Sequence, residues 1–345
     1  MGAGELTTWR PLRSVAAMLI RVPAFLSCVL VALLCVPGAR GDAGADLAKD
    51  SVFGQVDPAS LAGGKILTMR GPALNFPRDL TVEALYLVHA PVARSVVMHR
   101  MWDPGRHSEL KVYVHHDFST HPTLADFSQP LPGNSAVRRL SDATSGLPNM
   151  GDLQMSKGEA DDFKKSGGSV QGFWSQLLLH RATAFLQQGL SGLPPYDSSD
   201  GSARVSDEIS RLLGEQPRVR DAFAPIIAHS PLGGGGGVLP YWELFDVEGE
   251  GAFSLGATSS VQTGDSAQMV DLQYYASGGY YVFLTFYDFL PVTVNGKAST
   301  LVWRVDTISS LSLSDLSPFE RMGSGAAMMK DIQRIINFFQ KDTGR

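Results

Sequence analysis

Cysteine is nearly missing from this chain of 345 residues. Its two cysteines, Cys28 and Cys35, both lie within the first 41 residues. If that segment is removed, disulfide bonds, thiolate metal sites and cysteine nucleophiles are all excluded. The remaining ~300 residues must then fold through an apolar core alone, and a chain of that length can supply one.

Charged residues are also scarce, at 18% of the sequence against 44% hydrophobic residues. The apolar fraction excludes a disordered chain. Acidic residues outnumber basic ones, 34 to 29, and no extended run of lysine or arginine occurs. An acidic chain without such a run is a poor binder of nucleic acid, so we expect no nucleic-acid partner.

The motifs of common catalytic and cofactor sites are missing too. The sequence has no G-x-S-x-G, H-E-x-x-H or G-x-G-x-x-G, and its glycine run at 233–237 lacks the Gly-Lys-Ser/Thr ending of a phosphate loop. Five histidines fall between 99 and 121, but His115 and His116 are adjacent on an expected strand and point to opposite faces. We therefore expect no metal and no cofactor.

The N-terminal segment is typical of an export signal. Arg10, Arg13 and Arg21 precede an uncharged apolar run over 22–37, and Ala39-Arg40-Gly41 offers small residues for a signal peptidase. We expect residues 1–41 to be a signal peptide cleaved near Gly41, and the protein to be periplasmic or secreted. An uncleaved anchor and a lipoprotein are the alternatives.

Four segments follow the expected leader. Residues 42–79 are small and polar and predict a linker. Residues 80–118 predict a strand, a short helix and a second strand, because branched and aromatic residues are interrupted by Pro91 and by Asp103-Pro104-Gly105. Residues 119–240 carry helical patterns between Pro/Gly loops. Residues 241–341 predict several antiparallel strands, followed by a long helix that begins at Ser317-Pro318.

Asn295-Gly296 lies between two strand-like runs and predicts a type I′ hairpin. The register that follows pairs Trp303 with Asp288. One face of the hairpin is then more apolar, and we assign it to the interior; the opposite face carries Arg304 and Asp306, which suggests partial exposure. Asp288 would be the one charge on the inner face, unless Pro291 bulges the strand and leaves Asp288 at a solvated edge.

This order of elements resembles the START-like, or SRPBCC, helix-grip superfamily of polyketide cyclases and lipid-transfer proteins. The residues that carry the resemblance are Leu87–Ala93, Asp103–His107 and Met322–Gly325. The likeness covers residues 80–118 and 241–341, and the helical stretch 119–240 is a larger insertion than such proteins usually have. It implies an α+β fold in which a curved antiparallel sheet grips a long C-terminal helix, with a cavity between them.

The resemblance implies that this cavity binds a lipid or another small hydrophobic molecule. The candidate wall residues are Phe286, Asp288, Leu290, Leu301, Trp303, Met328 and Met329. Ordinary core packing is the alternative for each of them. We expect an exported binding or carrier protein that makes transient membrane contact.

Two other functions remain open. The first is an enzyme on the same fold that uses Asp288, Asp103 or His107 as a cavity acid or base. The second is a structural or protein-interaction protein of the envelope, with residues 119–240 as its interface.

Overall fold

A computed structural model describes residues 43–198 and 201–344. The signal peptide expected over residues 1–41, with its cleavage near Gly41, lies outside the described residues. Within the described part of the chain, no helix is both long and apolar enough to cross a membrane.

The largest element is an open, curved antiparallel sheet of eight strands in the order β1-β2-β10-β9-β8-β7-β6-β3. Two further short strands, β4 and β5, pair only with each other. The strands are β1 (Leu67–Arg70), β2 (Asp79–Val88), β3 (Val112–Asp117), β4 (Tyr196–Asp197), β5 (Ser202–Ala203), β6 (Leu239–Val247), β7 (Glu250–Thr263), β8 (Ser266–Ala276), β9 (Val282–Val294) and β10 (Lys297–Ser309). The two edge strands are short, and β3 contains a register shift, both of which limit pairing with other chains.

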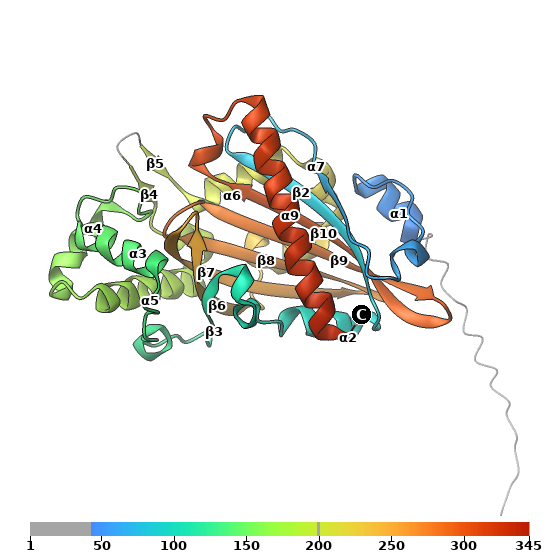
Figure 1. Cartoon of the computed structure of the whole chain (residues 1–345), viewed down its shortest axis with the longest axis horizontal. Coiled ribbons are helices and arrows are strands. Elements are labelled where there is room, and N and C mark those ends of the chain that lie inside the picture. Colours follow the sequence, from blue (N-terminus) through green and yellow to red (C-terminus); the bar gives the residue numbers. More distant parts are fainter. Residues whose placement is uncertain (1–42, 199–200, 345) are drawn as a thin grey trace, which may run out of the picture. The chain divides into compact units, whose positions relative to one another are not determined.

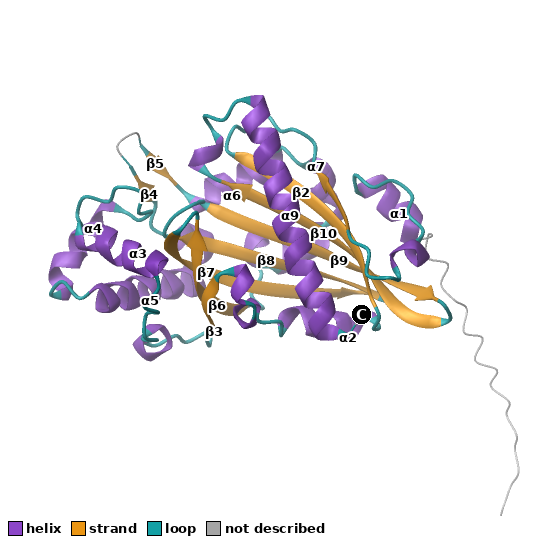
Figure 2. Ribbon diagram, viewed as in Figure 1, coloured by secondary structure: helices purple, strands orange, loops and turns teal. Residues whose placement is uncertain are grey.

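Helices cover both faces of this sheet (Figure 1; Figure 2). On one face α9 runs diagonally across the strands, together with α2. On the other face lie the helices between β3 and β6, which fall within residues 119–240. The helices are α1 (Ala43–Asp50), α2 (Val92–Arg100), α3 (Ser135–Ser145), α4 (Lys157–Asp162), α5 (Val170–Gln188), α6 (Val205–Gly214), α7 (Pro217–Ala222), α8 (Ala224–His229) and α9 (Pro318–Thr343).

The hairpin β9–β10 forms as the sequence predicts. Asn295 and Gly296 have φ angles of 51° and 73°, which is the left-handed conformation that a type I′ turn requires at both positions. Trp303 pairs with Asp288, and the ladder continues through Pro291 without a shift. The alternative in which Pro291 bulges the strand is therefore wrong.

The expected partial exposure of Arg304 and Asp306 is also wrong. Their side chains are 7% and 0% exposed. Arg304 donates from Nε and from a terminal nitrogen to the two oxygens of Asp306, each at 2.7 Å. Both charges are buried because residues two apart on one strand share a face, so each neutralises the other beneath α9.

The C-terminal helix α9 begins with a capping box. The Ser317 hydroxyl accepts from the Glu320 amide, and the Glu320 carboxylate accepts from the Ser317 amide. Its contact with the sheet is made by Gly325, Ile332, Ile336 and Phe339. Met322, near the start of the same helix, is 57% exposed.

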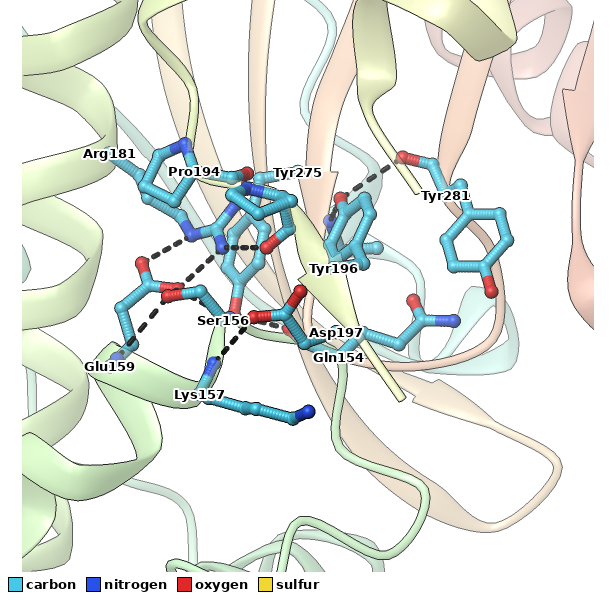
Figure 3. Close-up of polar contacts among 12 residues, drawn as sticks. Gln154, Ser156, Lys157, Glu159, Arg181, Pro194, Tyr196, Asp197, Tyr275 and Tyr281 are labelled. Carbon is cyan, nitrogen blue, oxygen red and sulfur yellow. Dashed lines mark hydrogen bonds and ion pairs between the residues drawn. The ribbon is translucent and has the colours of Figure 1, made fainter. Parts of the chain in front are cut away.

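The helices on the opposite face are held by a buried arginine (Figure 3). Arg181 on α5 donates two hydrogen bonds to Glu159 on α4, at 2.6 and 2.7 Å. Its guanidinium also lies 4.3 Å from the ring centroid of Tyr275 on β8. The cluster joins two helices to the sheet, and all of its charges are paired, which is typical of a structural role.

The architecture is thus α+β, with a curved sheet on a long C-terminal helix, as expected. It is compatible with a helix-grip topology. What the sequence did not reveal is that residues 119–240, together with α1 and the residues that follow it, cover the second face of the sheet. Two separate apolar clusters therefore lie on opposite sides of the strands.

Candidate functional site

A cavity of about 760 Å³ lies between the sheet and α9. It is lined by the strands β2, β3 and β6 to β10, by the second half of α9, and by the end of α2 and the loop that follows it. Pockets that hold small molecules usually have volumes of about 300–1,000 Å³, so its size suits a small organic ligand. It is the candidate site of this protein.

One wall of the cavity is apolar. Ile335, Ile336 and Phe339 line it from α9, and Phe283 and Ile308 line it from β9 and β10. Ile336 and Phe339 are buried against the sheet, whereas Ile335, one position round the helix, is only half-buried. Because of the helical spacing, Ile336 and Phe339 pack α9 against the sheet, whereas Ile335 faces the cavity.

The sheet side of the cavity also carries buried polar groups, which form its floor. Glu243 on β6 accepts a hydrogen bond from His115 Nδ1 on β3 at 2.9 Å. Burial alone would lower the pKa of His115, but the hydrogen bond and charge of Glu243 raise it above its ordinary value. Arg304, paired with Asp306, also lines this floor.

Tyr241 and Asp271 form a second polar pair on the floor. The Tyr241 hydroxyl donates to Asp271 Oδ1 at 2.7 Å, although β7 separates their strands, β6 and β8. The bond is possible because Tyr241 faces Gly256 on β7, where a Cβ atom would lie 2.2 Å from Tyr241 Cζ. The missing side chain lets the ring lie across the middle strand.

Burial raises the pKa of Asp271 to about 7. The hydrogen bond from Tyr241 opposes this shift and the nearby charge of Glu243 adds to it, while Arg304 and His115 lower the pKa. A carboxyl group with a pKa near 7 exchanges protons readily at neutral pH.

A neutral histidine closes the inner end of the cavity. His99 Nδ1 lies 2.7 Å from the Ser95 carbonyl oxygen, and His99 Nε2 lies 2.7 Å from the Tyr86 hydroxyl. Nδ1 therefore donates, and Nε2 accepts from the tyrosine. Burial lowers the pKa of His99 to about 3, which keeps the ring uncharged.

Exposed lining residues mark the mouth of the cavity. Met101 is 73% exposed and Leu239 is 43% exposed. The charged residues Lys111, Asp117 and Asp331 also line the cavity and are exposed. The entrance thus combines apolar and charged groups at the surface.

The seven candidate wall residues do not come together. The hairpin residues lie on the face that packs against the inserted helices: Phe286, Leu301 and Trp303 are buried in that core, and Leu290 packs beside it. Asp288 shares their face, opposite Trp303, and is half-buried.

Met328 and Met329 lie on the other side of the sheet, on α9, packed beside the smaller apolar cluster. None of the seven lines the cavity. The sheet separates the two groups, so they cannot enclose one ligand.

The other acid and base candidates have structural partners. Asp103 Oδ1 accepts from the Gly105 amide at 2.8 Å. His107 Nε2 and Trp102 Nε1 each lie 2.8 Å from Asp342 Oδ2, which fastens the loop after α2 to the end of α9. Across residues 43–198 and 201–344, no group of three or more histidine, cysteine and acidic residues is arranged to hold a metal ion.

The sequence analysis missed Tyr241, Glu243 and Asp271 as site residues. A signal was present, because Met269, Asp271 and Gln273 alternate with Val270 and Leu272 along β8. That alternation indicates a mixed face and an apolar face. The alternation did not indicate which face α9 covers and which face the helices of residues 119–240 cover.

Comparison of the chain with known protein families, curated proteins and solved structures finds no match.

Proposed function

We propose that this chain is an exported protein that binds or carries a lipid or another small hydrophobic molecule between its sheet and α9. The observation that carries the proposal is the cavity of about 760 Å³, with its apolar α9 wall and its polar floor. Binding pockets are mostly apolar, with a few polar groups that orient the ligand. The proposed site differs from the hairpin residues that sequence reasoning suggested.

The exposed entrance of the cavity favours a carrier that exchanges its ligand over a protein that keeps its ligand enclosed. Met101 and Leu239 are large apolar side chains exposed at the entrance. Exposed apolar groups suit transient contact with a membrane surface, from which a hydrophobic molecule could enter. Membrane contact and export are parts of this proposal.

Native mass spectrometry of the purified protein, followed by organic extraction, tests the proposal. We expect an added mass that extraction recovers as an apolar molecule. Ile335→Trp should remove the added mass, because the larger side chain projects from α9 into the cavity. Asn337→Trp is the matched control, since Asn337 is exposed on the same turn of α9.

Three results would count against a carrier. An added mass that survives Ile335→Trp unchanged would place the ligand elsewhere. An equal loss in Asn337→Trp would mean that tryptophan disturbs the helix itself. A bare mass, together with no uptake of added fatty acids or alcohols by the wild-type protein, would contradict ligand binding.

A further inference from the structure

Asp271 is the acidic group of the cavity floor whose contacts include no cation. Its hydrogen bond in the structure comes from the neutral Tyr241 hydroxyl. Within the described part of the chain, no lysine, arginine or histidine nitrogen lies within 4.0 Å of its carboxylate. A half-buried carboxylate in this position has lost much of its water without gaining a counter-charge.

The neighbouring cations already have partners. His115 donates to Glu243, and Arg304 binds both oxygens of Asp306. Each of these pairs is held by well-formed hydrogen bonds, so moving either cation to Asp271 would leave another buried acid unpaired. The protein itself therefore does not supply a contacting cation for Asp271.

The rest of the lining adds negative charge. Seven carboxylates face the cavity against four arginine and lysine side chains. The acids are Glu109, Asp117, Glu243, Asp246, Glu248, Asp271 and Asp331, and the bases are Arg100, Lys111, Arg304 and Arg334. The excess of acid remains if His115 is counted as charged, so the cavity attracts cations.

Aromatic rings surround the same space. Tyr241 lines the cavity from β6, Phe283 and Tyr287 line it from β9, and Tyr280 lines it from the loop between β8 and β9. The faces of aromatic rings attract ammonium groups, and the attraction is stronger where water is excluded. Acidic and aromatic groups together are the usual surroundings of a bound amine.

We propose that the ligand of this cavity is a protonated amine with an apolar body, whose ammonium group binds Asp271 and whose body lies against Ile335 and Phe339. The inference rests on the proposed function, because it names the chemical class of the molecule held there. The ammonium supplies the counter-charge that Asp271 lacks, and the α9 wall supplies the apolar contact.

Three probes of equal chain length test the amine: decylamine and decanoate, each below its micelle concentration, and decan-1-ol below its solubility limit. We expect calorimetry to show decylamine binding about tenfold to a hundredfold more tightly than decan-1-ol, the range for a hydrogen-bonded charge. Decanoate should bind most weakly. Asp271→Asn should reduce the preference for the amine to about threefold or less, since the amide that replaces the carboxylate can still accept from Tyr241 but carries no charge.

Asp331→Asn is the matched control. Asp331 also lines the cavity, but it is exposed at the mouth, on α9. The same loss of one charge there should leave the preference for decylamine within about threefold of wild type, because exposed charges are screened by water and salt. An equal loss in both variants would mean that general electrostatic attraction, and not Asp271, selects the amine, and would overturn the inference.

Proton release gives a second measurement on the wild-type protein. With a pKa of about 7, the empty Asp271 is partly protonated at neutral pH, and a bound ammonium favours its charged form. Decylamine binding at pH 7 should therefore release about half a proton, measured in two buffers of different ionisation enthalpy. The same titration of Asp271→Asn measures the protons that the other groups around the cavity release or take up. Subtracting that value from the wild-type value leaves the contribution of Asp271. The other groups are Tyr241, Glu243, His115, Arg304, Asp331 and Arg334.

The outcomes separate this inference from the proposed function. Proton uptake, or equal affinity for amine and alcohol, overturns the amine. If decan-1-ol still binds and Ile335→Trp still abolishes its binding, the cavity holds apolar ligands and the proposed function stands. If no probe binds, the amine is overturned, and the native mass of the protein decides the proposed function separately.

Discussion

A single glycine makes the polar floor possible. Gly256 faces Tyr241, and the space of its missing side chain is filled by the tyrosine ring. Tyr241 is buried, yet its hydroxyl reaches the cavity and holds Asp271. The position of Asp271 therefore depends on a residue that contributes no side chain of its own.

Gly256→Ala should destabilise the protein by about 1–3 kcal/mol, the usual cost of overpacking a filled site. The added methyl group would overlap the Tyr241 ring. Urea denaturation measures the loss. Gly278→Ala is the control, because the nearest atom to its new Cβ is 4.0 Å away. Adding Tyr241→Leu should recover part of the loss, and purely additive effects in that double variant would contradict the account.

His99 should make stability depend on pH. Its pKa of about 3 in the folded protein lies below the ordinary value of 6.5, so the unfolded chain binds the proton more readily. The contribution is complete above pH 6.5 and falls as the pH drops toward 3. Between about pH 6 and pH 4 the slope should approach 1.4 kcal/mol per pH unit.

The difference between wild type and His99→Gln isolates this effect. Both proteins keep Asp79 and Asp271, whose raised pKa values of about 6 and 7 change stability in the opposite direction. Urea denaturation from pH 4 to pH 8 should show the wild type losing stability relative to the variant as the pH falls. A flat difference would mean that the pKa of His99 is the same in the folded and the unfolded chain, and would contradict the account.

At the scale of elements, the N-terminus of α9 is stabilised by the capping box of Ser317 and Glu320. Ser317→Ala removes the hydroxyl that accepts from Glu320 and should cost about 1 kcal/mol. Ser324→Ala, in the same helix, removes a hydroxyl that only bonds back to the Glu320 carbonyl, so it should change stability by less than about 0.5 kcal/mol. Thermal denaturation compares the two, and equal effects would argue against the cap.

Local signals in the sequence predicted some elements well, whereas α1 and β1 lie in the segment that we expected to be a linker. Asn295-Gly296 set the hairpin register, and Ser317-Pro318 set the start of α9. These features depend on neighbours in the chain, which a sequence displays directly.

The faces of the central strands could not be assigned in the same way. A sheet covered on both sides has apolar residues on both faces, so alternation no longer distinguishes interior from solvent. Trp303 and Val302 are both buried, in clusters on opposite sides of the sheet. The candidate residues of the hairpin therefore lie on the face that packs against the inserted helices, although the register of the hairpin was predicted correctly.

At the scale of the whole molecule, Trp303 joins the sheet to the inserted helices. It is 2% exposed, its ring lies 5.0 Å from that of Phe223, and its Nε1 donates to Glu83 at 3.0 Å. Trp303→Ala should therefore cost about 3–5 kcal/mol by urea denaturation. Thr293→Ala, on the same hairpin but less buried, should be nearly neutral. A cost below about 1 kcal/mol for the tryptophan would mean that this layer is loosely packed.

The strand order also brings together parts of the chain that are far apart in sequence. Strands β6 to β9 each pair with the next strand along the chain, whereas β10 pairs with β2 across more than 200 residues, as Leu301 does with Leu87. Local pairings form early in folding, and distant ones form late because they must close long loops. The cavity is complete only when β2 and α9 have both docked.

A ligand between the sheet and α9 would then stabilise contacts that are absent from the folding transition state. Such contacts slow unfolding and leave the folding rate almost unchanged. We expect stopped-flow measurements with bound ligand to show a lower unfolding rate and an unaltered refolding rate. If the protein is a carrier, its bound ligand would then determine the lifetime of the folded state as well as being the molecule that is delivered.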